Sequence, residues 1–125
     1  MIKKIGVLTS GGDAPGMNAA VRSVVRSCVY NNVKITGILF GYQGLIDNKM
    51  KPMDARSVNN IINKGGTVLK TARCIDFFSK EGRKIAFEKI KDYKIDALVI
   101  IGGDGSFTGA LKFSNEYNIP LIGIP

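Results

Sequence analysis

The sequence of 125 residues contains no histidine and only two cysteines. Without histidine, a nucleophile activated by histidine is excluded, and so is a zinc site with a histidine ligand. The two cysteines, Cys28 and Cys74, are too few for a disulfide framework and fit no metal-binding spacing. This cysteine usage favours a reduced, cytoplasmic protein.

Long hydrophobic runs are also missing. The longest apolar stretches have about five residues, whereas a helix that spans a bilayer needs ~20. Residues 1–4 lead directly into a strand-like pattern, without the apolar stretch of a signal peptide. The sequence therefore predicts no membrane partner and a cytoplasmic localisation.

Acidic residues are few, so that 18 lysines and arginines against 10 aspartates and glutamates give a formal net charge of +8. The lysines are scattered, and no basic run with interleaved aromatic residues occurs, which argues against a nucleic-acid partner. Two interpretations of the charge stay open, namely solvated helix faces and a site for a polyanionic small molecule. The length and the ordinary share of charged residues, 22%, predict one globular domain over residues 1–125.

Apolar residues alternate between short strand-like runs and helix-like stripes along the whole chain. The runs predict strands over residues 5–8, 35–40, 97–101 and 120–124, of which 97–101 is interior because its five residues are all apolar. The stripes predict helices that bury Val21, Val24, Val25, Cys28 and Val29; Val58, Ile61 and Ile62 between Asp54 and Gly65; Ala86, Phe87, Ile90 and Tyr93 after Ser79; and Phe107, Ala110, Leu111 and Ser114. Strands that alternate with helices predict the α/β class: an open, mainly parallel sheet with helices on both faces. In such sheets ligands bind beyond the carboxyl ends of the strands.

The first candidate loop covers residues 9–16, between a predicted strand and a predicted helix. Gly11 and Gly12 lack side chains, so backbone N–H groups here can approach an anion closely, and the following helix adds the positive end of its dipole. The loop has neither the Walker pattern nor the dinucleotide pattern of glycines. A phosphate-binding loop and a tight turn without a ligand are both compatible with it.

The second candidate loop covers residues 102–106, again between a strand and a helix. Its glycines surround one carboxylate, Asp104, a hard oxygen ligand that suits Mg²⁺ shared with substrate phosphates. Ser106 either donates to a phosphate or caps the helix, and simple capping by Asp104 and Ser106 is the alternative to metal binding. Two glycine-rich loops at one sheet edge favour a phosphorylated ligand with a divalent metal.

Three arginines and one cysteine complete the candidates. Arg73 is either a phosphate partner or a surface residue, because a guanidinium fork can donate two hydrogen bonds to a phosphate. Cys74 has no neighbour in the sequence that would lower its pKa, which indicates inert packing. Arg22 and Arg26 are four residues apart and share one helix face, either as a solvated surface or as a second anion site away from the loops.

Several motifs of this sequence resemble those of one protein family. Residues 5–20 and 99–106, with the shorter pieces 41–45, 63–67 and 72–73, resemble the bacterial ATP-dependent 6-phosphofructokinases, without an obvious gap over all 125 residues. The resemblance implies the Rossmann-like N-terminal domain of these enzymes. It also implies a glycolytic kinase that transfers a phosphoryl group from MgATP to the 1-hydroxyl of fructose 6-phosphate, as a cytoplasmic homotetramer.

The resemblance also implies roles for particular residues. Gly12, Arg73, Cys74, Gly103, Asp104, Gly105 and Ser106 would contact ATP, and Asp104 would serve the Mg²⁺ ion. Gly105 indicates an ATP user, since relatives that use pyrophosphate have an aspartate at this position. Arg22 and Arg26 lie in the segment that binds the allosteric effector, ADP or phosphoenolpyruvate, between subunits.

This sequence departs from the family pattern at several positions. Lys70 and Ile75 replace a usual glycine and proline, and Ala55 stands where some relatives have an effector-binding arginine. Family members continue beyond the position of Pro125 into the loop that carries the proton-accepting aspartate. The sugar-phosphate arginines and a second domain follow later still. We therefore expect residues 1–125 to be an ATP-binding domain that is incomplete at its C-terminal end, without the second domain and with negligible kinase activity by itself.

Two other functions remain open at this stage. One is a non-catalytic nucleotide-binding module or remnant. The other is a domain similar to lipid or NAD kinases, which carry a comparable Gly-Gly-Asp-Gly loop. Residues 9–18 argue against the second alternative.

Overall fold

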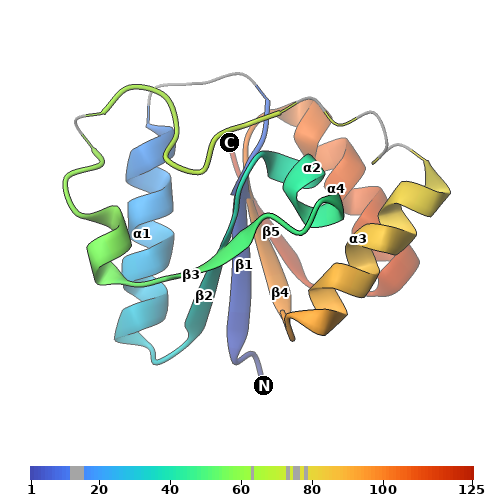
Figure 1. Cartoon of the computed structure of the whole chain (residues 1–125), viewed down its shortest axis with the longest axis horizontal. Coiled ribbons are helices and arrows are strands. Elements are labelled where there is room, and N and C mark those ends of the chain that lie inside the picture. Colours follow the sequence, from blue (N-terminus) through green and yellow to red (C-terminus); the bar gives the residue numbers. More distant parts are fainter. Residues whose placement is uncertain (12–15, 63, 73, 75–76, 78) are drawn as a thin grey trace.

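The chain forms one five-stranded sheet flanked by helices in a computed structural model that describes residues 1–11, 16–62, 64–72, 74, 77 and 79–125 (Figure 1). The side chain of Asp104 lies outside this description. In chain order the elements are β1 (Lys4–Thr9), α1 (Met17–Tyr30), β2 (Lys34–Ile38), α2 (Gly41–Ile46), β3 (Met50–Met53), the 3₁₀ helix η1 (Ala55–Val58), α3 (Lys80–Asp92), β4 (Ala97–Ile101), α4 (Asp104–Tyr117) and β5 (Leu121–Ile124).

The strand order is β3-β2-β1-β4-β5, and only β3 runs antiparallel to its neighbour. Ile5 lies opposite Ile35 of β2 and Ala97 of β4, so β1 is the centre of the sheet. All five residues of β4 are buried, as expected for an interior strand without polar alternation. The predicted α/β class with a mainly parallel sheet is confirmed.

Alternate residues of each strand point into two separate cores, one on each face of the sheet. Figure 1 shows α1 and η1 on one side of the sheet and α2, α3 and α4 on the other. Val7 and Val99 pack with α1, whereas their neighbours Leu8 and Leu98 pack with the other helices. The prediction of helices on both faces is therefore confirmed.

The segment between β2 and Gly65 differs from its prediction. The second strand ends at Ile38 instead of residue 40, since Phe40 adopts a left-handed φ of 63° and turns the chain into α2. The helix predicted between Asp54 and Gly65 is wrong. Asp54 does form a capping box with Ser57, but only the short η1 follows it.

The burial of three apolar side chains was also predicted wrongly. Ile62, Val29 and Leu111 are 53%, 44% and 59% exposed. The stripe of α4 passes through Ala110 and Phe113, which are three positions apart and both fully buried, and this leaves Leu111 on the solvent side. Within the described ranges, no helix is both long enough and apolar enough to cross a membrane.

Candidate functional site

The carboxyl ends of β1, β2 and β4 bring three chain segments into close contact. The N–H of Ser10 donates to the carbonyl of Ile101 at 2.9 Å. A Cβ atom on Gly102 would lie 2.6 Å from the carbonyl oxygen of Ser10, and one on Gly41 would lie 3.1 Å from that of Thr9. The described parts of the two glycine-rich loops, residues 9–11 and 102–103, therefore lie together at one edge of the sheet.

Two helices begin at this edge with a glycine as the N-cap residue, which has no side chain to cap the first-turn N–H groups. The N-cap residues of α1 and α4 are Gly16 and Gly103, and neither helix has a side-chain cap hydrogen bond among the residues described. By contrast, Ser79 caps α3 by accepting from the N–H of Gly82 at 3.0 Å. Among the described residues, the starts of α1 and α4 thus combine backbone N–H groups without a side-chain cap with the positive ends of two helix dipoles, which suits an anionic ligand.

Residues 103–106 lie at the open side of this edge. Cβ atoms on Gly103 and Gly105 would meet no atom of the described chain within 4 Å, so the space above both glycines is open. Ser106 is buried in the first turn of α4, and its Oγ would lie 3.7 Å from a Cβ on Gly11. The cap position itself is Gly103, which does not support the interpretation of Ser106 as a helix cap.

The buried side chain of Asn18 holds a segment of turns and bends, residues 61–62 and 64–70 (here called the strap), against the start of α1. Its amide donates to the carbonyls of Ile61 at 3.1 Å and Lys64 at 3.2 Å, and its oxygen accepts from the N–H of Val68 at 2.7 Å. A buried amide with all these bonds satisfied holds one geometry firmly. The strap therefore has a defined position beside the glycine-rich loops.

The far end of the strap is bound to the end of β1. The hydroxyls of Thr9 and Thr67 share a hydrogen bond of 3.0 Å, and Thr9 also donates to the carbonyl of Lys70 at 3.0 Å. Lys70 has a left-handed φ of 62°, a conformation that glycine adopts without strain. The position where the family resemblance expects a glycine thus keeps a backbone geometry that favours glycine.

The other predicted site residues are placed as follows. Gly12 and Arg73 lie outside the described residues, as do Ile75 and the side chain of Asp104, although the backbone of Asp104 begins α4. Cys74 is buried in the core on the side of α4, which agrees with a packing role for its thiol. The predicted contacts of these residues with ATP stay predictions.

The predicted metal at this edge is Mg²⁺, which would be shared between a protein carboxylate and the phosphates of a ligand. In the described part of the chain, no group of three or more cysteine, aspartate or glutamate side chains could hold a metal ion. Mg²⁺ commonly takes one or two carboxylates and completes its shell with water and phosphate oxygens. Asp104, whose backbone begins α4 at this edge, is compatible with that pattern as a carboxylate ligand beside phosphate oxygens, and its contact with Mg²⁺ stays a prediction.

Arg22 and Arg26 both lie on α1. Arg22 is half-buried and Arg26 is exposed, whereas the buried face of the helix includes Val21 and Val25. At a rise of about 1.5 Å per residue, Arg26 lies roughly 14 Å along the axis from the first residue of α1. Arg26 is therefore separate from the loop site, whereas Arg22 lies only about 7.5 Å along the axis from the first residue of α1. The role of both arginines as an effector site stays a prediction.

Tyr42 and Phe77 pack in the core next to the first turn of α4, and the sequence alone did not predict this role. Their rings stack with centroids 4.0 Å apart, and the Tyr42 hydroxyl donates to the carbonyl of Ser106 at 2.5 Å. Burial raises the pKa of Tyr42 well above its usual value, so the phenol is a neutral donor. Tyr42 falls within the segment 41–45 that supports the family resemblance, but that pattern alone does not reveal its contact with Ser106.

Comparison with known proteins decides between the remaining families. Residues 4–125 match the family described as Phosphofructokinase. This chain belongs to the phosphofructokinase family. It is 55% identical to ATP-dependent 6-phosphofructokinase 2 of Bacteroides thetaiotaomicron and 58% identical to ATP-dependent 6-phosphofructokinase of Halothermothrix orenii, over 99% of this chain in both cases.

The phosphofructokinase fold is matched in solved structures as well. Phosphofructokinase of Pichia pastoris in the T-state is 45% identical and superposes with a TM-score of 0.89, over 93% of this chain and 14% of that one. A pyrophosphate-dependent phosphofructokinase of Marinobacter aquaeolei, 19% identical with a TM-score of 0.83, shares the fold. The chain spans 38% and 37% of the length of the two bacterial relatives named above.

Proposed function

We propose that residues 1–125 form the nucleotide-binding part of an ATP-dependent 6-phosphofructokinase, which transfers a phosphoryl group from MgATP to the 1-hydroxyl of fructose 6-phosphate in glycolysis. The observation that carries the proposal is the pair of helix starts with glycine N-caps at one sheet edge, where no described atom lies within 4 Å of a Cβ on Gly103 or Gly105. The identity with bacterial ATP-dependent enzymes supports the choice of substrate.

Phosphoryl transfer asks a protein mainly for positioning and for stabilisation of negative charge. In the proposed site, the N–H groups that begin α1 and α4 and the guanidinium of Arg73 hold phosphate oxygens. Asp104 is the carboxylate for Mg²⁺, which would neutralise charge on the phosphates. Gly12, Cys74, Gly103, Gly105 and Ser106 would complete the contacts with ATP.

The remaining parts of the reaction belong to a longer chain in this proposal. The aspartate that accepts the sugar hydroxyl proton, and the arginines that hold the sugar phosphate, follow the matched segment in the family. A general base alone contributes roughly 10²–10⁴-fold to a rate, so nucleotide binding is the property to measure on residues 1–125. The proposal extends to a cytoplasmic homotetramer with Arg22 and Arg26 at a site for ADP or phosphoenolpyruvate.

Gly105→Ala tests the proposed phosphate site directly. The new Cβ meets no described atom of the protein, and alanine raises helix propensity by about 1 kcal/mol, so thermal stability is expected to stay level or rise. The same Cβ occupies the space proposed for phosphate, so the affinity for MgATP is expected to fall at least ~10-fold, or about 1.4 kcal/mol. Calorimetric titration and thermal unfolding measure the two properties separately.

The matched control is Leu111→Ala, which removes an exposed side chain from the same helix. The control should leave the MgATP affinity within about twofold of the original chain, because exposed positions away from a site rarely contribute. An unchanged affinity in Gly105→Ala would show that phosphate does not approach the start of α4.

A further inference from the structure

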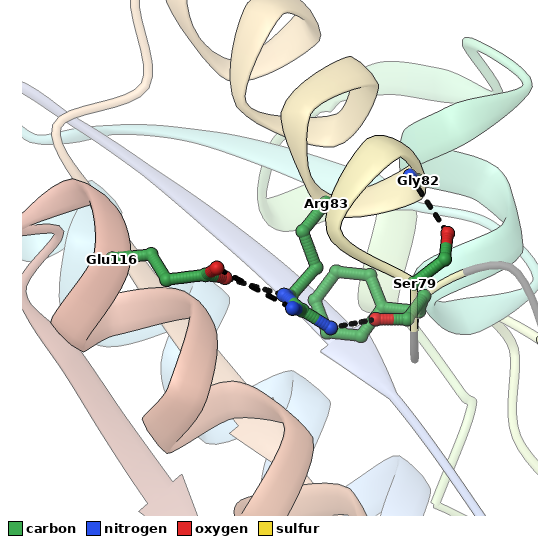
Figure 2. Close-up of polar contacts among 5 residues, drawn as sticks. Ser79, Gly82, Arg83 and Glu116 are labelled. Atoms are coloured by element: carbon green, nitrogen blue, oxygen red, sulfur yellow. Dashed lines mark hydrogen bonds and ion pairs between the residues drawn. The ribbon is translucent and has the colours of Figure 1, made fainter.

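Arg83 is a charged side chain buried to 4% exposure in α3. Its Nε and Nη2 donate to the two carboxylate oxygens of Glu116 in α4, the second at 3.3 Å, and Nη1 donates to the main-chain carbonyl of Phe77 at 3.0 Å. Figure 2 shows the guanidinium of Arg83 extending from α3 towards Glu116 on the neighbouring helix. Only a planar fork can make these three bonds in one geometry.

The carbonyl that Arg83 holds belongs to a residue that packs beneath the candidate site. The ring of Phe77 is 2% exposed, stacks on Tyr42, and would lie 3.5 Å from a Cβ on Gly109 of α4. Tyr42 in turn donates to the carbonyl of Ser106. A continuous set of contacts thus runs from the Arg83–Glu116 pair, through two stacked rings, to the first turn of α4.

We propose that Arg83 and Glu116 are a positioning pair that sets the geometry of the first turn of α4, where the phosphates are proposed to bind, by holding Phe77 against Tyr42. The nucleotide part of this inference rests on the proposed function. Glu116 lies ten residues from Ser106 in one helix, or about 15 Å along its axis, so the pair acts through other residues.

Stability alone gives a weak reason for this pair. The Arg83 side chain is only 5% exposed and loses its hydration, whereas the Glu116 side chain stays 23% exposed. Replacing a buried charge and its partner by apolar residues of similar volume is often neutral or stabilising. The Arg83 guanidinium holds the pKa of Glu116 below its usual value, with smaller contributions from Lys112 and Lys80, so Glu116 is ionised at neutral pH. An ionised carboxylate fixes the guanidinium in one orientation, and with it the carbonyl of Phe77.

Two conservative variants test the pair through nucleotide binding. Arg83→Lys keeps the charge but loses the fork, and Glu116→Gln keeps the shape but loses the charge. Both are expected to weaken MgATP binding about 10-fold, measured by calorimetry well below the melting temperature of each variant. The control Asn115→Ala, at an exposed position of the same helix, should change the affinity less than twofold. Variants that melt at lower temperature but keep the original affinity would reduce the pair to a structural role.

A double-mutant cycle tests the path of contacts. Tyr42→Phe removes the hydroxyl that binds Ser106 and keeps the stacked ring. If Glu116→Gln acts through this contact, the two changes together should weaken MgATP binding less than the product of their separate effects. Separate effects that simply multiply would overturn the proposed path.

A measurement without nucleotide separates this inference from the proposed function. Arg83→Lys is expected to shift the amide NMR signals of Ser106 and Phe107, and Asn115→Ala is expected to leave them in place. Unshifted signals in Arg83→Lys would overturn the positioning pair, whatever the affinity for ATP. Shifted signals in a chain that does not bind MgATP would support the pair and refute the proposed function of the site.

Discussion

Gly44→Ala is expected to destabilise the fold by about 3 kcal/mol or more, since overpacking against atoms that cannot move belongs to the most costly substitutions. A Cβ on Gly44 would lie 1.6 Å from the carbonyl oxygen of Leu39 and 2.8 Å from its carbon. These are main-chain atoms, and the turn around them is held by a hydrogen bond of 2.8 Å from Leu39 to Lys49 and another of 2.8 Å from Lys49 to Gly44. The helix α2 therefore has to move as a whole.

Thermal unfolding measures this loss as a fall in the melting temperature of roughly 10 °C or more for a chain of this length. Gly65→Ala is the matched control, because a Cβ there meets no described atom within 4 Å and the backbone has no positive φ. The control should melt within a few degrees of the original chain. Equal melting of the two variants would mean that the turn from Leu39 to Lys49 yields easily.

Gly102→Ala is expected to damage the candidate site and the fold together. The added Cβ would lie 2.6 Å from the carbonyl oxygen of Ser10 and 3.0 Å from Oγ of Ser106, so it would force the loop after β1 away from the start of α4. We expect a loss of about 2–3 kcal/mol in the free energy of unfolding, typical of overpacked positions. MgATP binding should fall beyond ~100-fold, because misplacing binding groups by about 1 Å can cost that much.

Urea unfolding and calorimetric titration check the two parts of this prediction. Gly103→Ala, one residue further on, introduces the same group where no described atom lies within 4 Å, so it should lose at most about 1 kcal/mol, the cost of alanine at a helix N-cap. A Gly102→Ala chain with unchanged stability and affinity would contradict the close approach of the two loops.

The sequence was most informative where a single segment determines its own structure. The strands β1 and β4 were predicted because unbroken apolar runs suit strands that are covered on both faces. The structure between β2 and Gly65 was not predicted, because α2 has only six residues and follows the left-handed Phe40. The conformation of Phe40 is fixed by a hydrogen bond from its N–H to the distant carbonyl of Leu69. Leu69 lies outside residues 39–50, so no pattern within those residues can predict this contact.

The same distinction applies to the candidate site. Glycine-rich loops after strands are visible in a sequence, and the structure places their described parts together. Tyr42, Arg83 and Asn18 were missed because their importance comes from partners far along the chain: Tyr42 reaches a residue 64 positions away, and Asn18 reaches one 50 positions away. One sequence without these pairings gives no reason to prefer these side chains over others of the same type.

The sheet also divides the apolar interior into two compartments that share only its backbone. Val21 and Val25 belong to one compartment, and Phe113 and Ile90 belong to the other. A change of volume on one side leaves the partners of the other side in place, so the two compartments can accept substitutions independently during evolution. The face that packs α2, α3 and α4 carries Tyr42 and Phe77 beneath the start of α4. The face of α1 carries Asn18 beside the start of α1, so the freedom to change is greatest on each face away from the helix starts.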